Sequence, residues 1–327
     1  MDLAQEALYL VIGFYLLARG SDWLVAGSSR LAARAGVRPL IVGLTVVALG
    51  TSAPEVVVST LGALDGQPSL AMGNVLGSNV ANIGLVLGVS SLLLPAVMHR
   101  GLALRETLWL LGSVALLWVV CGDGEVTRLD GGVLLIALAV YNLQLLWEAR
   151  QLSLGARPDL AEPETWCETR PVLATVVGAV GIAFAAWLTI EGAVALADRI
   201  GIDERVVGLT VVAVGTSLPE LAAGVTGALR GQSEISVGNV VGSNVFNVLG
   251  VIGVVAVVRP FGGEVEPGVV EDLAQNTSID FPIVLGFSVA ALAATGLSGE
   301  RFGRTKGALL LLAYLGYMAY LFLAGRV

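Results

Sequence analysis

The sequence predicts an all-helical protein that crosses a membrane many times, and three observations support this. Of the 327 residues, 56% are hydrophobic and 13% are charged, and the mean hydropathy is +0.84. A soluble globule of this size needs more polar surface, so lipid must cover most of the chain. Apolar stretches of about 20 residues, enough to cross a bilayer core, recur almost throughout. Finally, one segment of the chain returns 165 residues later.

Apolar runs that end at charged residues, glycine or proline predict ten transmembrane helices. The first run follows an acidic start without a basic flank, so we expect a spanning helix and not a cleavable signal. The expected ranges are 3–35, 39–64, 69–95, 102–121, 129–147, 171–200, 204–229, 233–258, 281–297 and 306–324.

Basic residues predict the orientation of these helices. Cytoplasmic connections are rich in Lys and Arg, and only the topology with both termini outside the cytoplasm collects most of them on one side. The connections then inside hold Arg30, Arg34, Arg38, Arg100, Arg105, Arg150, Arg157, Arg170, Arg230, Arg301, Arg304 and Lys306. Those outside hold Arg128, Arg199, Arg205, Arg259 and Arg326.

The internal repeat is the strongest signal in the sequence. VGLTVVALGTSAPE, ending at Glu55, returns as VGLTVVAVGTSLPE, ending at Glu220. The same shift places GNVLGSNVAN (73–82) on GNVVGSNVFN (238–247) without a gap, and over half the positions of 42–88 are identical in 207–253. Five helices per half is an odd number, so the second copy must enter the membrane from the opposite face. We therefore expect two inverted five-helix repeats, 1–148 and 171–327, joined by a cytoplasmic linker, 149–170.

The repeated glutamates indicate a cation site. An ionised carboxylate at a helix centre in the membrane costs about 2.5–3.5 kcal/mol or more, which a bound cation compensates. Each glutamate follows a proline, Pro54 or Pro219, which donates no backbone N–H. The carbonyl groups four residues before these prolines, at Gly50 and Gly215, therefore lose their helical partners and are free to bind a cation.

Hydroxyl and amide groups accompany the glutamates in both halves. Calcium takes about 6–8 oxygen ligands, and these residues supply oxygens, whereas zinc or copper prefers His or Cys. The polar residues are Thr51, Ser52, Asn74, Ser78, Asn79 and Asn82 in the first half and Thr216, Ser217, Asn239, Ser243, Asn244 and Asn247 in the second. Individual Ser, Thr and Asn residues in membrane helices also serve only to join helices, and that alternative stays open for each of them.

Three other functions remain to be weighed against ion exchange. Paired carboxylates also line passive cation channels, although two inverted copies in one chain suit alternating access better. A membrane enzyme is disfavoured because no nucleophile has a histidine near it in sequence. No basic stripe for nucleic acid exists. The role of Glu191, which lies within the sixth expected helix, is left open between packing and an ion pathway.

With the paired GTSxPE and GNxxGSNxxN motifs, the chain resembles the cation/calcium exchanger superfamily, in its sodium/calcium exchanger branch. The resemblance covers the whole ten-helix plan. It implies an ion-binding core made by the second, third, seventh and eighth helices, against which the first and sixth slide. The implied ion ligands are Thr51, Ser52, Glu55, Ser78, Asn82, Thr216, Ser217, Glu220, Ser243 and Asn247, with the carbonyl groups of Ala48 and Ala213 binding sodium.

The resemblance also sets the expected function. It implies antiport of calcium against sodium, with proton-coupled calcium antiport as the alternative, in the cell (inner) membrane. Calcium, sodium and the lipid bilayer are the expected partners; no cofactor is expected, and no oligomer is required. Some members carry Asp where this chain has Asn82 or Asn247, so only two carboxylates remain here.

Overall fold

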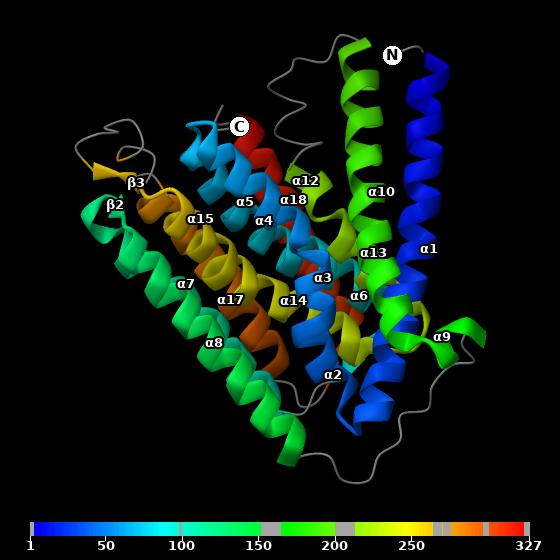
Figure 1. Ribbon diagram of the computed structural model, residues 1–327. Coiled ribbons are helices and arrows are strands. Elements are labelled where there is room, and N and C mark those ends of the chain that lie inside the picture. Colours follow the sequence, from blue (N-terminus) through cyan, green and yellow to red (C-terminus); the bar gives the residue numbers. More distant parts are fainter. Residues whose placement is uncertain are drawn as a thin grey trace.

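The computed structural model describes residues 3–97, 100–151, 165–199, 213–263, 270, 276–296 and 301–323. Helices make up almost all of the described chain (Figure 1). Part of the seventh expected helix, 204–212, and most of the linker, 152–164, lie outside the described residues.

The first half begins with one long straight helix and continues with two composite ones. Helix α1 has the bounds that the sequence predicted, Leu3–Ala35. The composite helices consist of α2 (Pro39–Val42), a π-helical turn (Gly43–Val47), α3 (Ala48–Thr51) and α4 (Ala53–Leu64), then α5 (Pro68–Ala81), a π-helical turn (Asn82–Val86) and α6 (Leu87–Leu93). The half ends with α7 (Arg100–Val120), a 3-10 turn (Cys121–Asp123) and α8 (Arg128–Gln151), which runs four residues past its expected end at 147.

The second half repeats much of this order. After the short α9 (Thr165–Thr169), which the sequence did not predict, come α10 (Pro171–Arg199), α12 (Ala213–Thr216) and α13 (Leu218–Leu229). Then follow α14 (Ser233–Phe246), a π-helical turn (Asn247–Val251), α15 (Ile252–Val258), a π-helical turn (Asn276–Asp280), α17 (Phe281–Gly296) and α18 (Arg304–Leu323). Elements from α3 to α6 recur as α12 to α15 at the shift of 165 residues that relates Asn79 to Asn244.

Two pairs of two-residue strands add to the helices. Strand β1 (Ala96–Val97) pairs antiparallel with β4 (Arg301–Phe302), and β2 (Glu125–Val126) pairs antiparallel with β3 (Phe261–Gly262). Each pair joins a connection of the first half to one of the second. The all-helical prediction missed them, because two residues are too few for a strand to show in the hydrophobic pattern.

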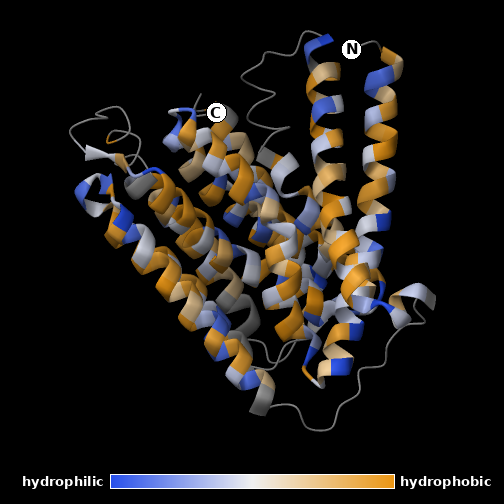
Figure 2. Ribbon diagram, viewed as in Figure 1, coloured by the Kyte–Doolittle hydropathy of each residue, from blue (hydrophilic) through white to orange (hydrophobic). Residues whose placement is uncertain are grey.

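Polarity is arranged as expected for a protein in lipid. Large apolar side chains such as Ile136 and Val180 are 66% and 65% exposed, whereas Glu55 and Glu220 are fully buried. Figure 2 shows hydrophobic colour along much of the long outer helices α8 and α10. Within the described residues, six helices are long and apolar enough to cross a membrane, or seven if Pro39–Thr51 and Ala53–Leu64, bent by 42°, form one span. Membrane spanning is confirmed, and the count of ten remains a prediction.

The helices form two peripheral pairs around a central group. Figure 1 places α1 beside α10 at one side and α7 and α8 at the other, with α2–α6 and α12–α15 between them. Helices α5 and α14 supply much of the largest hydrophobic cluster, including Leu76, Val80, Val240 and Val245. The repeated motif therefore occupies the centre of the molecule.

Glycines let α1 and α10 pack closely as an antiparallel pair. Small residues at every seventh position allow two helix backbones to approach along one seam. The glycines of α1 are Gly13, Gly20 and Gly27, which face Thr189, Ile182 and Thr175 of α10. The ion pair between Glu6 Oε1 and Arg199 Nη2, at 2.7 Å, joins the same helices near their ends.

Two polar contacts tie this pair to the centre. Asp22 Oδ1 lies 2.9 Å from Arg230 Nη2, just after α13, and Ser21 Oγ lies 2.8 Å from Thr226 Oγ1. Within α1, Asp22 Oδ2 also pairs with Arg19 Nη1, at 3.7 Å. Asp22 thus forms ion pairs both within α1 and with Arg230, just after α13.

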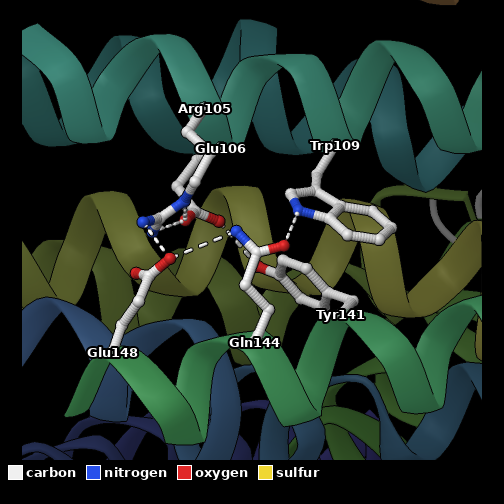
Figure 3. Close-up of polar contacts among 6 residues, drawn as sticks. All are labelled: Arg105, Glu106, Trp109, Tyr141, Gln144 and Glu148. Carbon is white, nitrogen blue, oxygen red and sulfur yellow. Dashed lines mark hydrogen bonds and ion pairs between the residues drawn. The ribbon is translucent and has the colours of Figure 1, made fainter. Parts of the chain in front are cut away.

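A polar cluster joins α7 and α8 (Figure 3). Arg105 pairs with both Glu106 and Glu148, and Tyr141 Oη donates a hydrogen bond of 3.0 Å to Glu106 Oε2. Gln144 extends the cluster along α8: it accepts from Trp109 Nε1 at 2.9 Å and donates to Glu148 at 3.1 Å. The sequence did not predict this cluster.

We expect Gly20→Ala to destabilise the protein by about 1–3 kcal/mol, because the added methyl overpacks the seam. It would lie 2.7 Å from Ile182 Cγ2 and 3.0 Å from Ile182 N. Thermal unfolding of the purified protein in detergent measures the effect. The control is Gly112→Ala in α7, where a methyl meets nothing within 4 Å; equal stability of the two variants would contradict close packing at Gly20.

We expect Arg105→Leu to destabilise the protein by about 3–5 kcal/mol, because it leaves the carboxylates of Glu106 and Glu148 buried without their cation. Tyr141→Phe removes one hydrogen bond to a charged group and should cost less, about 1.5–3 kcal/mol. Thermal unfolding ranks the two variants. The prediction is wrong if Tyr141→Phe unfolds at the lower temperature.

Candidate cation site

Each half interrupts a helix just before its glutamate. Ser52 separates α3 from α4 with φ −86° and ψ 5°, and Ser217 separates α12 from α13 with φ −88° and ψ 4°. The proline two residues on cannot donate a backbone hydrogen bond, which explains why both helices break here. Glu55 and Glu220 therefore lie in the first turn of a new helix, where the helix dipole favours a negative charge.

The next helix of each half, α5 or α14, changes from α-helical to π-helical winding at a corresponding asparagine. Helix α5 passes into its π-helical turn at Asn82, and α14 does so at Asn247. Such turns insert an extra residue, re-aim the following side chains and are frequent at functional sites. Helix α4 packs against the turn that begins at Asn247, and α13 packs against the turn that begins at Asn82. Each glutamate helix thus meets a segment of the other half.

Nearly all of the predicted site residues are buried, and none of those with a measured exposure is more than 3% exposed. These buried residues are Ala48, Thr51, Ser52, Glu55, Ser78, Asn82, Thr216, Ser217, Glu220, Ser243 and Asn247. Ala213 is the first residue of α12.

Hydrogen bonds within the site run between the two halves. Ser52 Oγ donates to Glu220 Oε1 at 3.0 Å. Thr51 Oγ1 donates to Asn239 Oδ1 at 2.9 Å, and its counterpart Thr216 Oγ1 donates to Asn74 Oδ1 at 3.2 Å. Sequence reasoning missed this pairing, because no pattern in the chain shows which residues of the two halves meet.

Asn79 and Asn244, which correspond under the repeat, hydrogen-bond each other across the two halves. Asn79 Nδ2 donates to the carbonyl oxygen of Asn244 at 3.3 Å, and Asn244 Nδ2 donates to the carbonyl oxygen of Asn79 at 3.4 Å. Residues that correspond under the repeat and exchange the same bond lie about a local two-fold axis. Helices α5 and α14 therefore cross at this axis.

The polar side chains around the axis do not follow the symmetry fully. Asn82 Nδ2 donates to Asn244 Oδ1 at 3.0 Å, whereas the side chain of Asn247 has no hydrogen-bond partner among the described residues. Glu220 accepts from Ser52, whereas neither carboxylate oxygen of Glu55 has a partner there. The two motif segments share over half of their sequence and the bounds of their helices, and they differ in these contacts.

The buried oxygen atoms that have no hydrogen-bond partner are of the kind that bind a hard cation. Buried polar atoms nearly always have a partner, so a cluster of buried oxygens without one indicates a ligand. Among the predicted ligands in the part of the chain that the structure describes, the side-chain oxygens without a hydrogen-bond partner are both carboxylate oxygens of Glu55, Oε2 of Glu220, Oγ of Ser78 and Ser217, and Oδ1 of Asn82 and Asn247. Carboxylate, hydroxyl and amide oxygens are the ligands that calcium takes. Within the described ranges, no group of three or more His, Cys, Asp or Glu residues is placed to hold a metal.

The structure adds residues to the predicted set. Asn74, Asn79, Asn239 and Asn244, which the repeat marked as polar motif residues but which are not among the implied ligands, lie in the same network. The carbonyl of Ala48 accepts hydrogen bonds from Ser52 N at 3.0 Å and Thr51 Oγ1 at 3.3 Å. Glu191 of α10 is exposed, and Cys121 and Cys167 are both buried and not joined by a disulfide.

Comparison with known proteins places the chain among transporters. The model of the sodium/calcium exchanger protein family matches residues 6–147 and 171–323. The inner membrane protein YrbG of Escherichia coli is 34% identical, and the match covers 96% of this chain and 95% of YrbG. The sodium/calcium exchanger MaX1 of Methanosarcina acetivorans is 28% identical, over 96% of this chain and 98% of MaX1.

The fold is also similar to that of a solved exchanger. A structure of the sodium-calcium exchanger NCX_Mj superposes with a TM-score of 0.81 at 30% identity, over 98% of this chain and 100% of that one. The family match extends over both halves of the chain, and the fold match extends over nearly all of it. The chain is therefore a multi-pass membrane transporter that belongs to the sodium/calcium exchanger protein family.

Proposed function

We propose that the protein is a secondary antiporter that exchanges calcium for sodium at one site containing Glu55 and Glu220. The observation that carries this proposal is the pair of fully buried glutamates at matching helix breaks, surrounded by oxygens without hydrogen-bond partners. Membership of the exchanger family and the fold of NCX_Mj support the same function.

The proposed ligands are the side-chain oxygens of the two repeats together with backbone carbonyls. Two carboxylates and several neutral oxygens suit calcium and sodium, both of which bind hard oxygen donors. The set is Thr51, Ser52, Glu55, Ser78, Asn82, Thr216, Ser217, Glu220, Ser243 and Asn247, with the carbonyl groups of Ala48 and Ala213.

Exchange follows if calcium and sodium exclude one another from this site. One calcium ion neutralises the two carboxylates, and the ionised pair without a cation is costly inside the membrane. The protein therefore crosses between its two access states only when loaded. Because the same oxygens bind either ion, release of one ion on each side must precede binding of the other, which couples the two fluxes.

We further propose that the chain crosses the membrane ten times as two inverted repeats, 1–148 and 171–327, joined by the linker 149–170. The two segments matched by the family model, 6–147 and 171–323, support this division. The start of α1 and the end of α18 lie at the same end of the molecule (Figure 1), which supports an even number of crossings. The excess of basic residues in the connections favours both termini outside the cytoplasm of the inner membrane.

We expect Glu55→Gln and Glu220→Gln each to reduce calcium uptake to the level of empty liposomes, because a neutral amide cannot compensate the charge of a divalent ion. Uptake of radioactive calcium into proteoliposomes measures the effect. Glu125→Gln, an exposed glutamate of β2, is the matched control and should transport normally. Full activity of both buried variants would show that the cation binds elsewhere.

We expect calcium uptake only into proteoliposomes loaded with sodium, and not into those loaded with potassium or choline at the same pH. A parallel set carries an imposed proton gradient. Uptake that follows the proton gradient and ignores sodium would identify a proton-coupled antiporter instead. Uptake that needs no counter-ion and hardly saturates would identify a channel.

A further inference from the structure

We propose that Asn239 and Asn74 are positioning residues, which orient the hydroxyl groups of Thr51 and Thr216 so that oxygen lone pairs, and not protons, face the transported cation. This inference rests on the proposed function, because it assigns a role to residues around the same site. Neither asparagine belongs to the predicted ligand set.

The first contact is between Thr51 and Asn239. Both side chains are fully buried, and Thr51 Oγ1 lies 2.9 Å from Asn239 Oδ1. A hydroxyl group has one proton and two lone pairs. The carbonyl oxygen of Ala48 and Ser243 Oγ both lie farther from Thr51 Oγ1, at 3.3 Å, so Asn239 Oδ1 is the nearest acceptor for its one proton. When the proton points to Asn239, the lone pairs of Thr51 Oγ1 face away from it and are available to a cation.

The orientation of each amide is fixed by its other end. Asn74 Nδ2 donates to Ser59 Oγ at 3.0 Å, and Asn239 Nδ2 lies 3.5 Å from the carbonyl oxygen of Glu220. Because the nitrogen of each amide is used there, the oxygen is the atom presented to the threonine. Asn239 also links α14 to the backbone of the residue that supplies a carboxylate.

The same contact occurs in the other half. Thr216 Oγ1 donates to Asn74 Oδ1 at 3.2 Å, and these residues correspond to Thr51 and Asn239 under the repeat. Ser52 and Ser217 do not keep such symmetry, since Ser52 donates to Glu220, whereas Ser217 Oγ has no hydrogen-bond partner within the described ranges. The threonine–asparagine pairs are thus kept where other contacts of the site differ.

The chemistry explains why the acceptor is an amide. A carboxylate would accept the threonine proton equally well but would add a third negative charge to a site with two. An apolar side chain would leave the Thr51 proton only the longer contacts of 3.3 Å, to the carbonyl oxygen of Ala48 and to Ser243 Oγ, which hold it less firmly away from the cation. Residues that orient metal ligands in this way typically contribute 10–100-fold to metal affinity.

A double-mutant cycle tests the inference. Calcium binding to the purified full chain is measured by titration calorimetry without sodium, up to millimolar calcium, for wild type, Asn239→Leu, Thr51→Val and the double variant. We expect Asn239→Leu to weaken calcium binding about tenfold or more. In the Thr51→Val background the same change should have less than about a twofold effect, because the hydroxyl to be oriented is absent.

A control variant and a second cycle keep the test decisive. Asn142→Leu, which removes an amide that donates to the carbonyl of Leu138 in its own helix, should bind calcium like wild type. The mirror cycle with Asn74→Leu and Thr216→Val replaces the first if a variant does not fold, as judged by size-exclusion chromatography. An equal loss in both backgrounds, or no loss in Asn239→Leu, would overturn the positioning role. Failure of the wild type to bind calcium would instead overturn the proposed function.

Discussion

The burial of two carboxylates in a protein surrounded by lipid is the constraint on which the rest of the structure depends. Glu55 and Glu220 are fully buried, and charge there is costly unless oxygen-rich surroundings and a cation offset it. Helix breaks, π-helical turns and cross-half hydrogen bonds all place polar groups around these two residues. A uniformly wound helix would direct its backbone groups into itself and offer none of them to an ion.

The periphery of the protein is built on a different principle. The pair α1 and α10 packs through glycines along its seam, and Ser21 and Asp22 of α1 make polar contacts with α13 and with the residue just after it. The α7–α8 pair has its own buried polar cluster around Arg105. The central group, by contrast, is joined by side-chain hydrogen bonds that run between the two motif segments.

Much of the fold was predictable because two of its features, apolar helix length and internal repetition, can be read directly from the residues. Apolar length predicted the membrane helices, with α1 and the composite α14–α15 at their expected bounds, and sequence identity predicted the recurrence of α3–α6 as α12–α15. The residues of the candidate site were found because they repeat. Contacts such as Thr51 with Asn239, 188 residues apart, depend on how the helices pack and leave no periodic trace. The α7–α8 cluster was missed for the same reason.

The reciprocal bonds between Asn79 and Asn244 have a geometric consequence. A two-fold operation carries this pair of bonds onto itself, whereas it carries the single bond from Asn82 to Asn244 onto a different one, from Asn247 to Asn79. If the two halves exchange conformations, the central bonds keep their partners, whereas the bond from Asn82 to Asn244 is replaced by its counterpart from Asn247 to Asn79.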